Sequence, residues 1–71
     1  MDAELYHANL QCIYDRFGEE SMTIPFGAVA EWLGVDRRTL QRDRTFPIKK
    51  IGRAWVCAKP ALASWLSKSN L

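Results

Sequence analysis

The 71-residue chain is predicted to be a single domain, mainly α-helical with one small β-hairpin. Apolar residues recur at helical spacing in three stretches, Gly or Pro stands at the expected ends of these stretches, and two β-prone segments flank a Gly-Arg dipeptide. A hydrophobic fraction of 48% and a charged fraction of 25% are typical of a folded domain rather than a disordered chain. A chain of this length builds one small core, which leaves no room for a deep catalytic cleft.

The start of the chain and its cysteines argue against a secreted, a membrane-spanning or a metal-binding protein. The first ten residues, MDAELYHANL, lack the basic and apolar regions of a signal peptide, and no segment approaches the ~20 apolar residues of a membrane span. We therefore expect a cytoplasmic protein with no membrane partner. Cys12 and Cys57 each lie in an apolar pattern without a second Cys or His at metal-ligand spacing, so no metal site is predicted. Both are expected to be buried free thiols, with a disulfide as the less favoured alternative.

The first helix is predicted from Asp2 to Phe17, within an amino-terminal support segment of residues 1–20. Its apolar stripe has helical spacing and consists of Tyr6, Leu10, Ile13, Tyr14 and Phe17. Gly18 is placed to end this helix in a left-handed conformation. His7 lies beside the stripe without a nucleophile or ligand partner, so we expect no catalytic role for it.

A second helix is predicted after a short extended piece at residues 22–24. Pro25 suits its first turn, because the missing N–H of proline is not needed there. The apolar face follows i, i+3, i+4 and i+7 spacing and consists of Phe26, Val29, Ala30 and Leu33. Gly34 is predicted to end the helix, and Trp32, which lies off the stripe, is expected to pack against the first or the last helix.

A third helix is predicted over residues 37–44, with Asp36 as its N-cap. This cap makes Val35 and Leu40 the pair that forms a hydrophobic staple at the helix start. Only Gly34, Val35 and Asp36 separate the second helix from the third. So short a connection matches a helix-turn-helix, which together with the hairpin is assigned to residues 22–57.

The outward face of the third helix follows from one leucine. Leu40 is the only strongly apolar residue between positions 36 and 45, so it is expected to point into the core. A step of about 100° per residue then places Arg38 and Arg42 about 160° away from it, while Gln41 and Thr39 lie about 100° away. These side-chain types reach base edges in the major groove. The predicted base-reading residues are therefore Arg38, Thr39, Gln41 and Arg42.

The basic residues are concentrated in the second half of the chain. Residues 1–34 contain one Arg and six acidic residues, whereas residues 35–71 contain nine Lys or Arg and two acidic residues. Clustered positive charge favours a polyanionic partner, because it raises the local concentration of opposite charge. A merely solvated basic surface is the alternative on charge alone. Arg37 and Arg44 flank the base-reading face and are expected to contact phosphates.

A β-hairpin and a final helix are predicted after the basic helix. Residues 48–51 and 54–57 are β-prone and flank Gly52-Arg53, a two-residue turn typical of a hairpin. Trp55 and Cys57 share one strand face and are predicted to point inward. The basic hairpin residues expected to contact phosphates are Lys49, Lys50 and Arg53. The final helix is assigned to residues 59–69, opens with Pro60 and has an apolar face of Leu62, Trp65 and Leu66.

The order of these segments, from about Thr23 to Leu66, resembles a known family. It runs VAEWLGVDRRTLQR, then FPIKKIGRAW, then ALASWL, with LGV before the third helix and Pro, Lys and Ile-Gly before a Trp-bearing hairpin. This pattern is similar to the excisionase-type branch of the MerR-like winged helix-turn-helix family. The chain departs from the family pattern in two respects: the interval from Val35 to Pro47 is shorter, and an amino-terminal helix is added.

The resemblance implies a small DNA-binding protein carried by a prophage, plasmid or integrative element. It implies the helix at 37–44 in the major groove and the wing at 48–57 on the backbone or the minor groove. Such proteins act as excisionases, which set the direction of recombination for an integrase, or as small transcription regulators. An integrase or recombinase is thus one further partner. Self-association on DNA is another, since the added helix either supports the domain or mediates association.

From its residues, the chain is predicted to bind double-stranded DNA with some sequence preference and to catalyse nothing. It has no Ser/His/Asp set, no paired carboxylates in a cleft and no phosphate-binding Gly loop, so neither a cofactor nor a small-molecule ligand is expected. A hypothesis from another class is a winged-helix module that binds an acidic protein partner. Salt dependence separates the two, because each phosphate contact releases counterions.

Overall fold

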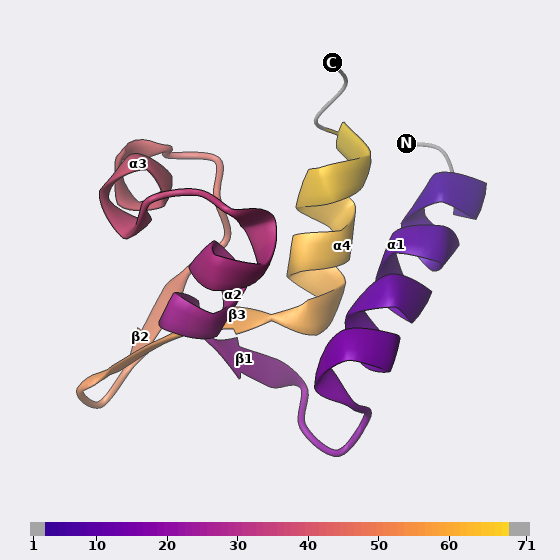
Figure 1. Ribbon diagram of the computed structural model, residues 1–71, viewed down its shortest axis with the longest axis horizontal. Coiled ribbons are helices and arrows are strands. Elements are labelled where there is room, and N and C mark those ends of the chain that lie inside the picture. The colour runs from indigo at the N-terminus through magenta and orange to yellow at the C-terminus, as the bar shows by residue number, and fades with distance from the viewer. Residues whose placement is uncertain (1–2, 69–71) are drawn as a thin grey trace.

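The computed structural model describes residues 3–68 and shows a mixed α/β domain (Figure 1). In chain order its elements are α1 (Ala3–Phe17), β1 (Thr23–Pro25), α2 (Phe26–Leu33), α3 (Arg37–Arg42), β2 (Lys49–Ile51), β3 (Ala54–Ala58) and α4 (Lys59–Lys68). The predicted helix start at Asp2 and the predicted helix end at residue 69 lie outside the described residues. None of the helices within residues 3–68 has the length and apolarity needed to cross a bilayer.

The sheet is larger than the sequence predicts. Within the described residues it has three antiparallel strands in the order β1-β3-β2. The hairpin of β2 and β3 is confirmed, since Ile51 pairs with Ala54 across the expected two-residue turn, where Gly52 has a φ of 63°. The segment expected only to be extended is instead a third strand, in which Ile24 pairs with Cys57. Its pairing partner lies far along the chain, so no local pattern identifies it. Within residues 3–68 the domain therefore has four helices, as predicted, and a three-stranded antiparallel sheet where the sequence predicts only a hairpin.

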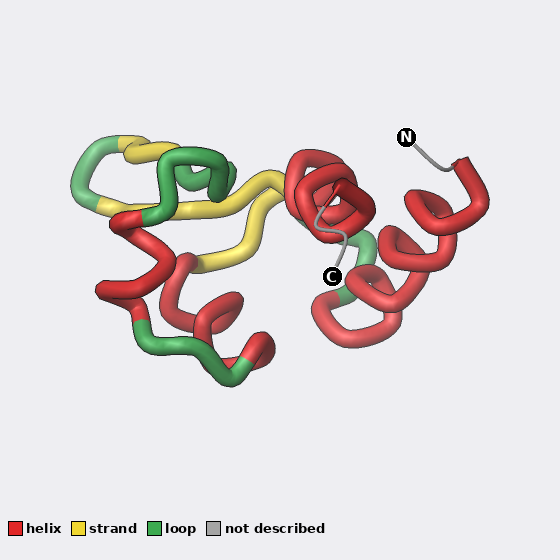
Figure 2. Tube along the Cα trace, turned by 90° about the horizontal axis from the view of Figure 1, so that it is seen from above, coloured by secondary structure: helices red, strands yellow, loops and turns green. Residues whose placement is uncertain are grey.

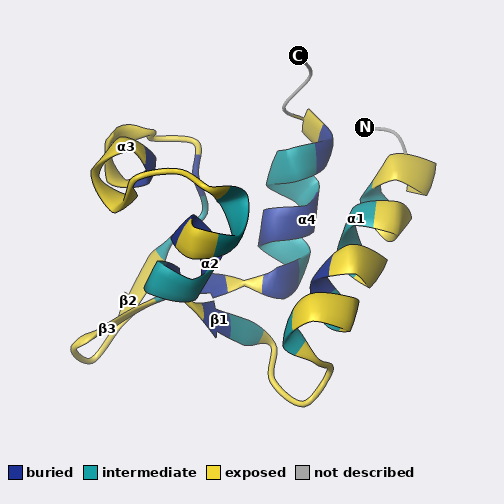
Figure 3. Cartoon of the chain, in the orientation of Figure 1, coloured by how far each residue is buried: buried dark blue, intermediate teal, exposed yellow. Residues whose placement is uncertain are grey.

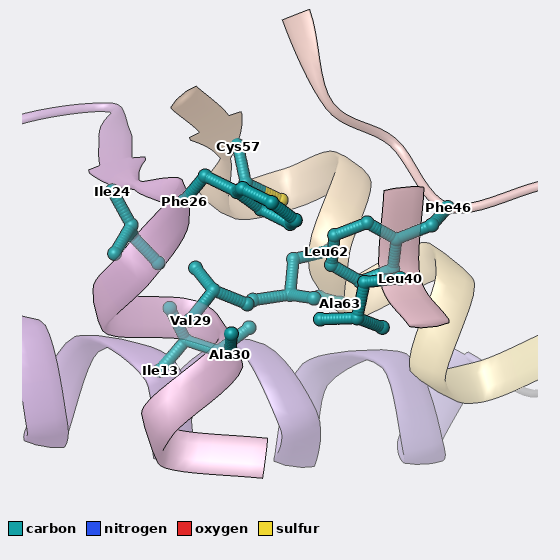
Figure 4. Close-up of a cluster of buried hydrophobic side chains, with 10 residues drawn as sticks. All are labelled: Ile13, Ile24, Phe26, Val29, Ala30, Leu40, Phe46, Cys57, Leu62 and Ala63. Atoms are coloured by element: carbon teal, nitrogen blue, oxygen red, sulfur yellow. The ribbon is translucent and has the colours of Figure 1, made fainter. Parts of the chain in front are cut away.

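One cluster of buried side chains forms the core (Figure 4). Its members are Ile13, Ile24, Phe26, Val29, Ala30, Leu40, Phe46, Cys57, Leu62 and Ala63. Every helix contributes to it, together with β1, β3 and the loop before β2. The expected burial of Ile13, Leu40 and Leu62 is confirmed. Trp32 packs edge-on against Phe17 of α1 with ring centroids 5.4 Å apart, so its partner is the first helix.

Helices α1 and α4 lie side by side (Figures 1 and 2). Gly18 ends α1 with a φ of 84°, as predicted. At this end Lys59 is only 1% exposed: its Nζ donates a hydrogen bond to the Gly18 carbonyl at 2.5 Å and lies 5.7 Å from the centre of the Tyr14 ring. Further along the pair, Asn9 donates to Ser67 at 3.1 Å. A buried ammonium requires such partners, so Lys59 fixes the start of α4 against the end of α1.

The two cysteines are free, as predicted, but only Cys57 is buried. Cys12 is exposed because the adjacent Ile13, which is fully buried, takes the inward position on α1. The prediction of two buried thiols is therefore wrong for Cys12. Burial raises the pKa of the Cys57 thiol to about 11, which keeps it protonated and unreactive near neutral pH.

Candidate nucleic-acid interface

The connection between α2 and α3 has the boundaries that the sequence predicts. Gly34 adopts the left-handed conformation at the end of α2, with φ 71° and ψ 30°. The Asp36 side chain accepts a hydrogen bond from the Arg38 backbone N–H at 2.8 Å, so it caps α3 as predicted. Val35 remains 37% exposed, whereas Leu40 is 4% exposed. The burial of Leu40 therefore comes chiefly from the core cluster rather than from a staple with Val35.

Leu40 anchors α3 and leaves its other residues on the outside. It is the only buried residue of this six-residue helix. Exposed residues form the outer side of α3 (Figure 3), and all four residues predicted to read bases are exposed: Arg38, Thr39, Gln41 and Arg42. Within residues 3–68, no hydrogen bond or ion pair involves their side chains. The structure thus presents the four side chains together on one short helix, with their polar groups free.

Arg37 differs from its neighbours on α3 because its side chain runs toward α2. A Cβ built on Gly27 of α2 would collide with the Arg37 guanidinium. Gly27 therefore provides the space in which this guanidinium lies. Arg37 remains exposed overall, so it is placed at the flank of α3, as the helical geometry predicts.

Helix α3 is shorter than predicted: it ends at Arg42 rather than at residue 44. Asp43 leaves the helical conformation with φ −79° and ψ 109°. Its carboxylate instead accepts hydrogen bonds from the Thr45 hydroxyl at 2.7 Å and from the Thr45 backbone N–H at 2.9 Å. These bonds, chiefly the one from the hydroxyl, hold the pKa of Asp43 below its ordinary value of 3.8. Arg44 consequently lies in the following turn, where it is exposed.

This turn is connected to α4 by contacts that the sequence does not predict. The indole Nε1 of Trp65 donates a hydrogen bond to the Thr45 hydroxyl at 3.0 Å. The Trp65 ring also packs edge-on against Phe46, with ring centroids 4.9 Å apart. The spacing of Asp43 and Thr45 is a local signal for such a turn, but the role of Trp65 depends on the tertiary fold. The end of α3 is therefore held by α4 as well as by its own sequence.

The hairpin carries its basic side chains on two opposite faces. Because side chains alternate along a strand, the cross-strand pair Lys50 and Trp55 lies on the same face as Cys57, which points into the core beneath α2. The pair Lys49 and Val56 lies on the other face, where both residues line a groove that is mostly apolar. Lys50 therefore points to the side of the sheet that bears α2 and α3, and Lys49 points away from it.

The prediction that Trp55 points into the core is wrong, since 43% of its surface is exposed. It lies on the same strand face as the buried Cys57, as predicted, but two residues closer to the turn. The core ends before this position, so the face continues into solvent. There the Lys50 ammonium lies 5.7 Å from the centre of the Trp55 ring.

The charge division along the chain is also a division in space. Helix α1 lies at one end of the molecule, and α3 and the hairpin turn lie at the other (Figures 1 and 2). On and just after α1 the exposed acidic residues are Glu4, Asp15, Glu19 and Glu20. On α3 and the hairpin the exposed basic residues are Arg37, Arg38, Arg42, Lys49, Lys50 and Arg53. A polyanion would therefore be attracted to the α3 end and repelled from the α1 end.

Comparisons with protein-family models, with curated proteins and with solved structures found no match for this chain. Within residues 3–68, no group of three His, Cys, Asp or Glu side chains is placed to hold a metal ion. The exposed basic residues of the second half of the chain lie mainly on α3, in the turn that follows it and on the hairpin, where the Gln41 and Trp55 side chains are exposed as well.

Proposed function

We propose that this protein binds double-stranded DNA as a winged helix-turn-helix, with α3 in the major groove and the β2–β3 hairpin as the wing on the adjacent backbone or minor groove. One observation carries the proposal. Leu40 is buried at 4% exposure, and the arginines on either side of it, Arg38 and Arg42, are exposed, with no side-chain hydrogen bond or ion pair to any of residues 3–68. Two arginines one helical turn apart repel each other, so their joint exposure is favourable opposite a polyanion.

The exposed groups of α3 match the chemistry of base edges. Arginine donates two parallel hydrogen bonds to guanine, and glutamine pairs in the same way with adenine. Arg38, Gln41 and Arg42 are the proposed base-reading residues, with Thr39 beside them. Phosphate contacts position such a helix without reading sequence. The proposed phosphate contacts are Arg37, Arg44, Lys50 and Arg53; Lys49 is expected among them from the sequence, but it points to the opposite sheet face.

Within DNA binding, the resemblance to excisionases favours a recombination directionality factor that works with an integrase. A small transcription regulator is the alternative role of the same fold. A module that binds an acidic protein is the alternative from another class, and the exposed basic surface alone is compatible with it. Titration with DNA at several salt concentrations separates this last alternative from the proposal.

The first experiment titrates the protein with a mixed-sequence duplex across a range of salt concentrations. Each neutralised phosphate is expected to contribute a slope of about −0.9 to the dependence of log affinity on log salt. Absence of salt-dependent duplex binding would remove the proposal. A preferred site is then selected from a pool of random duplexes, which supplies the specific ligand for the variants.

The variants separate base contacts from phosphate contacts. Arg38→Ala or Arg42→Ala should weaken binding to the preferred site by about 1 to 3 kcal/mol and narrow its advantage over random DNA. Lys50→Ala should weaken binding to all duplexes alike and flatten the salt slope. Lys49→Ala is the matched control, because it removes the same charge from the opposite face of the hairpin and should have the smaller effect. Equal losses on preferred and random duplexes for both arginine variants would exclude base reading.

A further inference from the structure

Two of the three tryptophans are engaged inside the fold, and the third is not. Trp32 packs against Phe17, and Trp65 donates its indole N–H to Thr45. Trp55 is 43% exposed, and the Lys50 ammonium lies over its ring at 5.7 Å. Single exposed apolar side chains are common on protein surfaces, so exposure alone assigns no role. The direction in which Trp55 points is the additional observation.

Trp55 lies on the face of the sheet that packs against the core, but at a position beyond the edge of the core. It shares a strand face with Cys57, and its cross-strand partner Lys50 lies on that face as well. This is the side of the sheet on which α2 packs and on which Leu40 of α3 enters the core. Ile51, by contrast, is 57% exposed on the opposite face, where it lines the groove beside Lys49. The aromatic ring and one ammonium group of the wing are thus on the α3 side.

We infer that Trp55 is a DNA-contacting residue, which packs its ring against the deoxyriboses of the backbone beside the groove that α3 enters, while Lys50 pairs with an adjacent phosphate. This inference rests on the proposed DNA-binding function. In a duplex the base faces are stacked on one another, so the accessible apolar surfaces are the sugars and the base edges. The Trp55 ring and the adjacent Lys50 ammonium are complementary to a deoxyribose and its adjacent phosphate. Aromatic side chains are also the residues that contribute most binding energy where they become desolvated at interfaces.

Fluorescence tests the contact directly. The wild-type protein, Trp55→Phe and Trp32→Phe are titrated with a mixed-sequence duplex at low salt, and the quenching of tryptophan emission by acrylamide is measured with and without DNA. DNA should protect the emission of the wild-type protein and of Trp32→Phe from acrylamide. It should have little effect on Trp55→Phe, because the two remaining indoles are engaged within the protein.

Affinity provides the second readout. Trp55→Ala should weaken duplex binding by about 10-fold, the scale of truncating an aromatic side chain that becomes desolvated at an interface, and Trp55→Phe should retain most of the affinity. Ile51→Ala is the matched control, because it removes an exposed apolar side chain from the other face of the same hairpin and should bind like the wild type. Urea unfolding of each variant excludes loss of folding as the cause. If Trp55→Ala is unfolded, the inference is judged by whether DNA protects the emission of Trp55→Phe from acrylamide.

The outcomes distinguish this inference from the proposed function. If the wild-type protein binds the duplex while DNA protects no emission and Trp55→Ala binds normally, the inference is overturned and the proposed function stands. If the wild-type protein binds no duplex at any salt concentration, the proposed function fails and the inference fails with it. Protection that is lost in Trp55→Phe, together with the weaker binding of Trp55→Ala, supports both.

Discussion

The N-cap of α3 offers a quantitative test of how the candidate interface is built. The helix has six residues, and Leu40 is its only buried one. A helix this short does not persist in water without help from packing and capping. Asp36 supplies the cap through the hydrogen bond of 2.8 Å from the Arg38 N–H to its carboxylate. Replacing Asp36 with alanine removes this acceptor and leaves the backbone otherwise unchanged.

The expected loss is large relative to the stability of so small a domain. Removing an N-cap costs about 0.5 to 2 kcal/mol. At roughly 0.05 to 0.15 kcal/mol per residue, a domain of this length has a free energy of unfolding of about 4 to 11 kcal/mol. A cost of about 1 kcal/mol should lower Tm by about 4 to 8 °C. Asp36→Ala should therefore give a shift that a circular-dichroism melt resolves easily.

Asp36→Asn is the control, since it removes the same negative charge but retains a side chain that caps well. Any gain in DNA attraction from losing an acidic group is shared by the two variants. We expect Asp36→Asn to melt near the wild type and Asp36→Ala to melt lower. Equal melting of the two variants below the wild type would show that the charge, not the cap, is stabilising. A melt of Asp36→Ala that matches the wild type would mean that the helix does not depend on this cap.

Further predictions concern the thiols and the turn after α3. A thiol reagent should modify Cys12 in the native protein and Cys57 only after unfolding, because one is exposed and the other buried; fast native modification of both would contradict the fold. The folded pKa of Cys57, about 11, lies above the ordinary value of 9.0, so the stabilisation it provides should be complete below about pH 9 and lost as pH rises toward 11. The difference in unfolding free energy between the wild type and Cys57→Ala should shrink over that range. For Asp43 the sign is opposite: its folded pKa lies below 3.8, so its contribution should be present above that pH and lost as pH falls further. The wild type should therefore be more stable than Asp43→Ala near neutral pH, and urea titrations that show the same difference at strongly acidic pH would exclude the ionised bond to Thr45.

Local signals account for the parts of the fold that the sequence predicts. Glycine at positions 18 and 34 ends two helices in the left-handed conformation, and Asp36 caps a third. The hairpin follows from β-prone runs around Gly52. The outward position of Arg38 and Arg42 follows from one buried leucine and the pitch of a helix. Each of these features depends on residues only a few positions apart, which a sequence displays directly.

The features that were missed depend on contacts between distant segments. The pairing of β1 with β3 joins residues 23–25 to residues 56–58, and no local pattern indicates it. The alternation along the strand predicts the correct face for Trp55, but the exposure of Trp55 depends on where the core ends. Helix α3 is short because the Asp43 carboxylate accepts a hydrogen bond from the Thr45 hydroxyl instead of continuing the helix. Trp65 of α4 stabilises this turn by donating a hydrogen bond to the same hydroxyl. In each case the deciding contact is made by a residue that is distant in the sequence and becomes a neighbour only in the folded structure.

The hydrogen bond from Lys59 to the Gly18 carbonyl has a practical consequence for anyone who wishes to trim the protein. Removing the segment up to residue 20 would expose the buried Lys59 ammonium group and remove its hydrogen-bond acceptor. It would also expose the apolar side of α4 to water. A fragment that begins after residue 20 should therefore aggregate or unfold rather than bind DNA as a minimal domain. Residues 1–20 have to be retained in any expression experiment, even if they never touch the ligand.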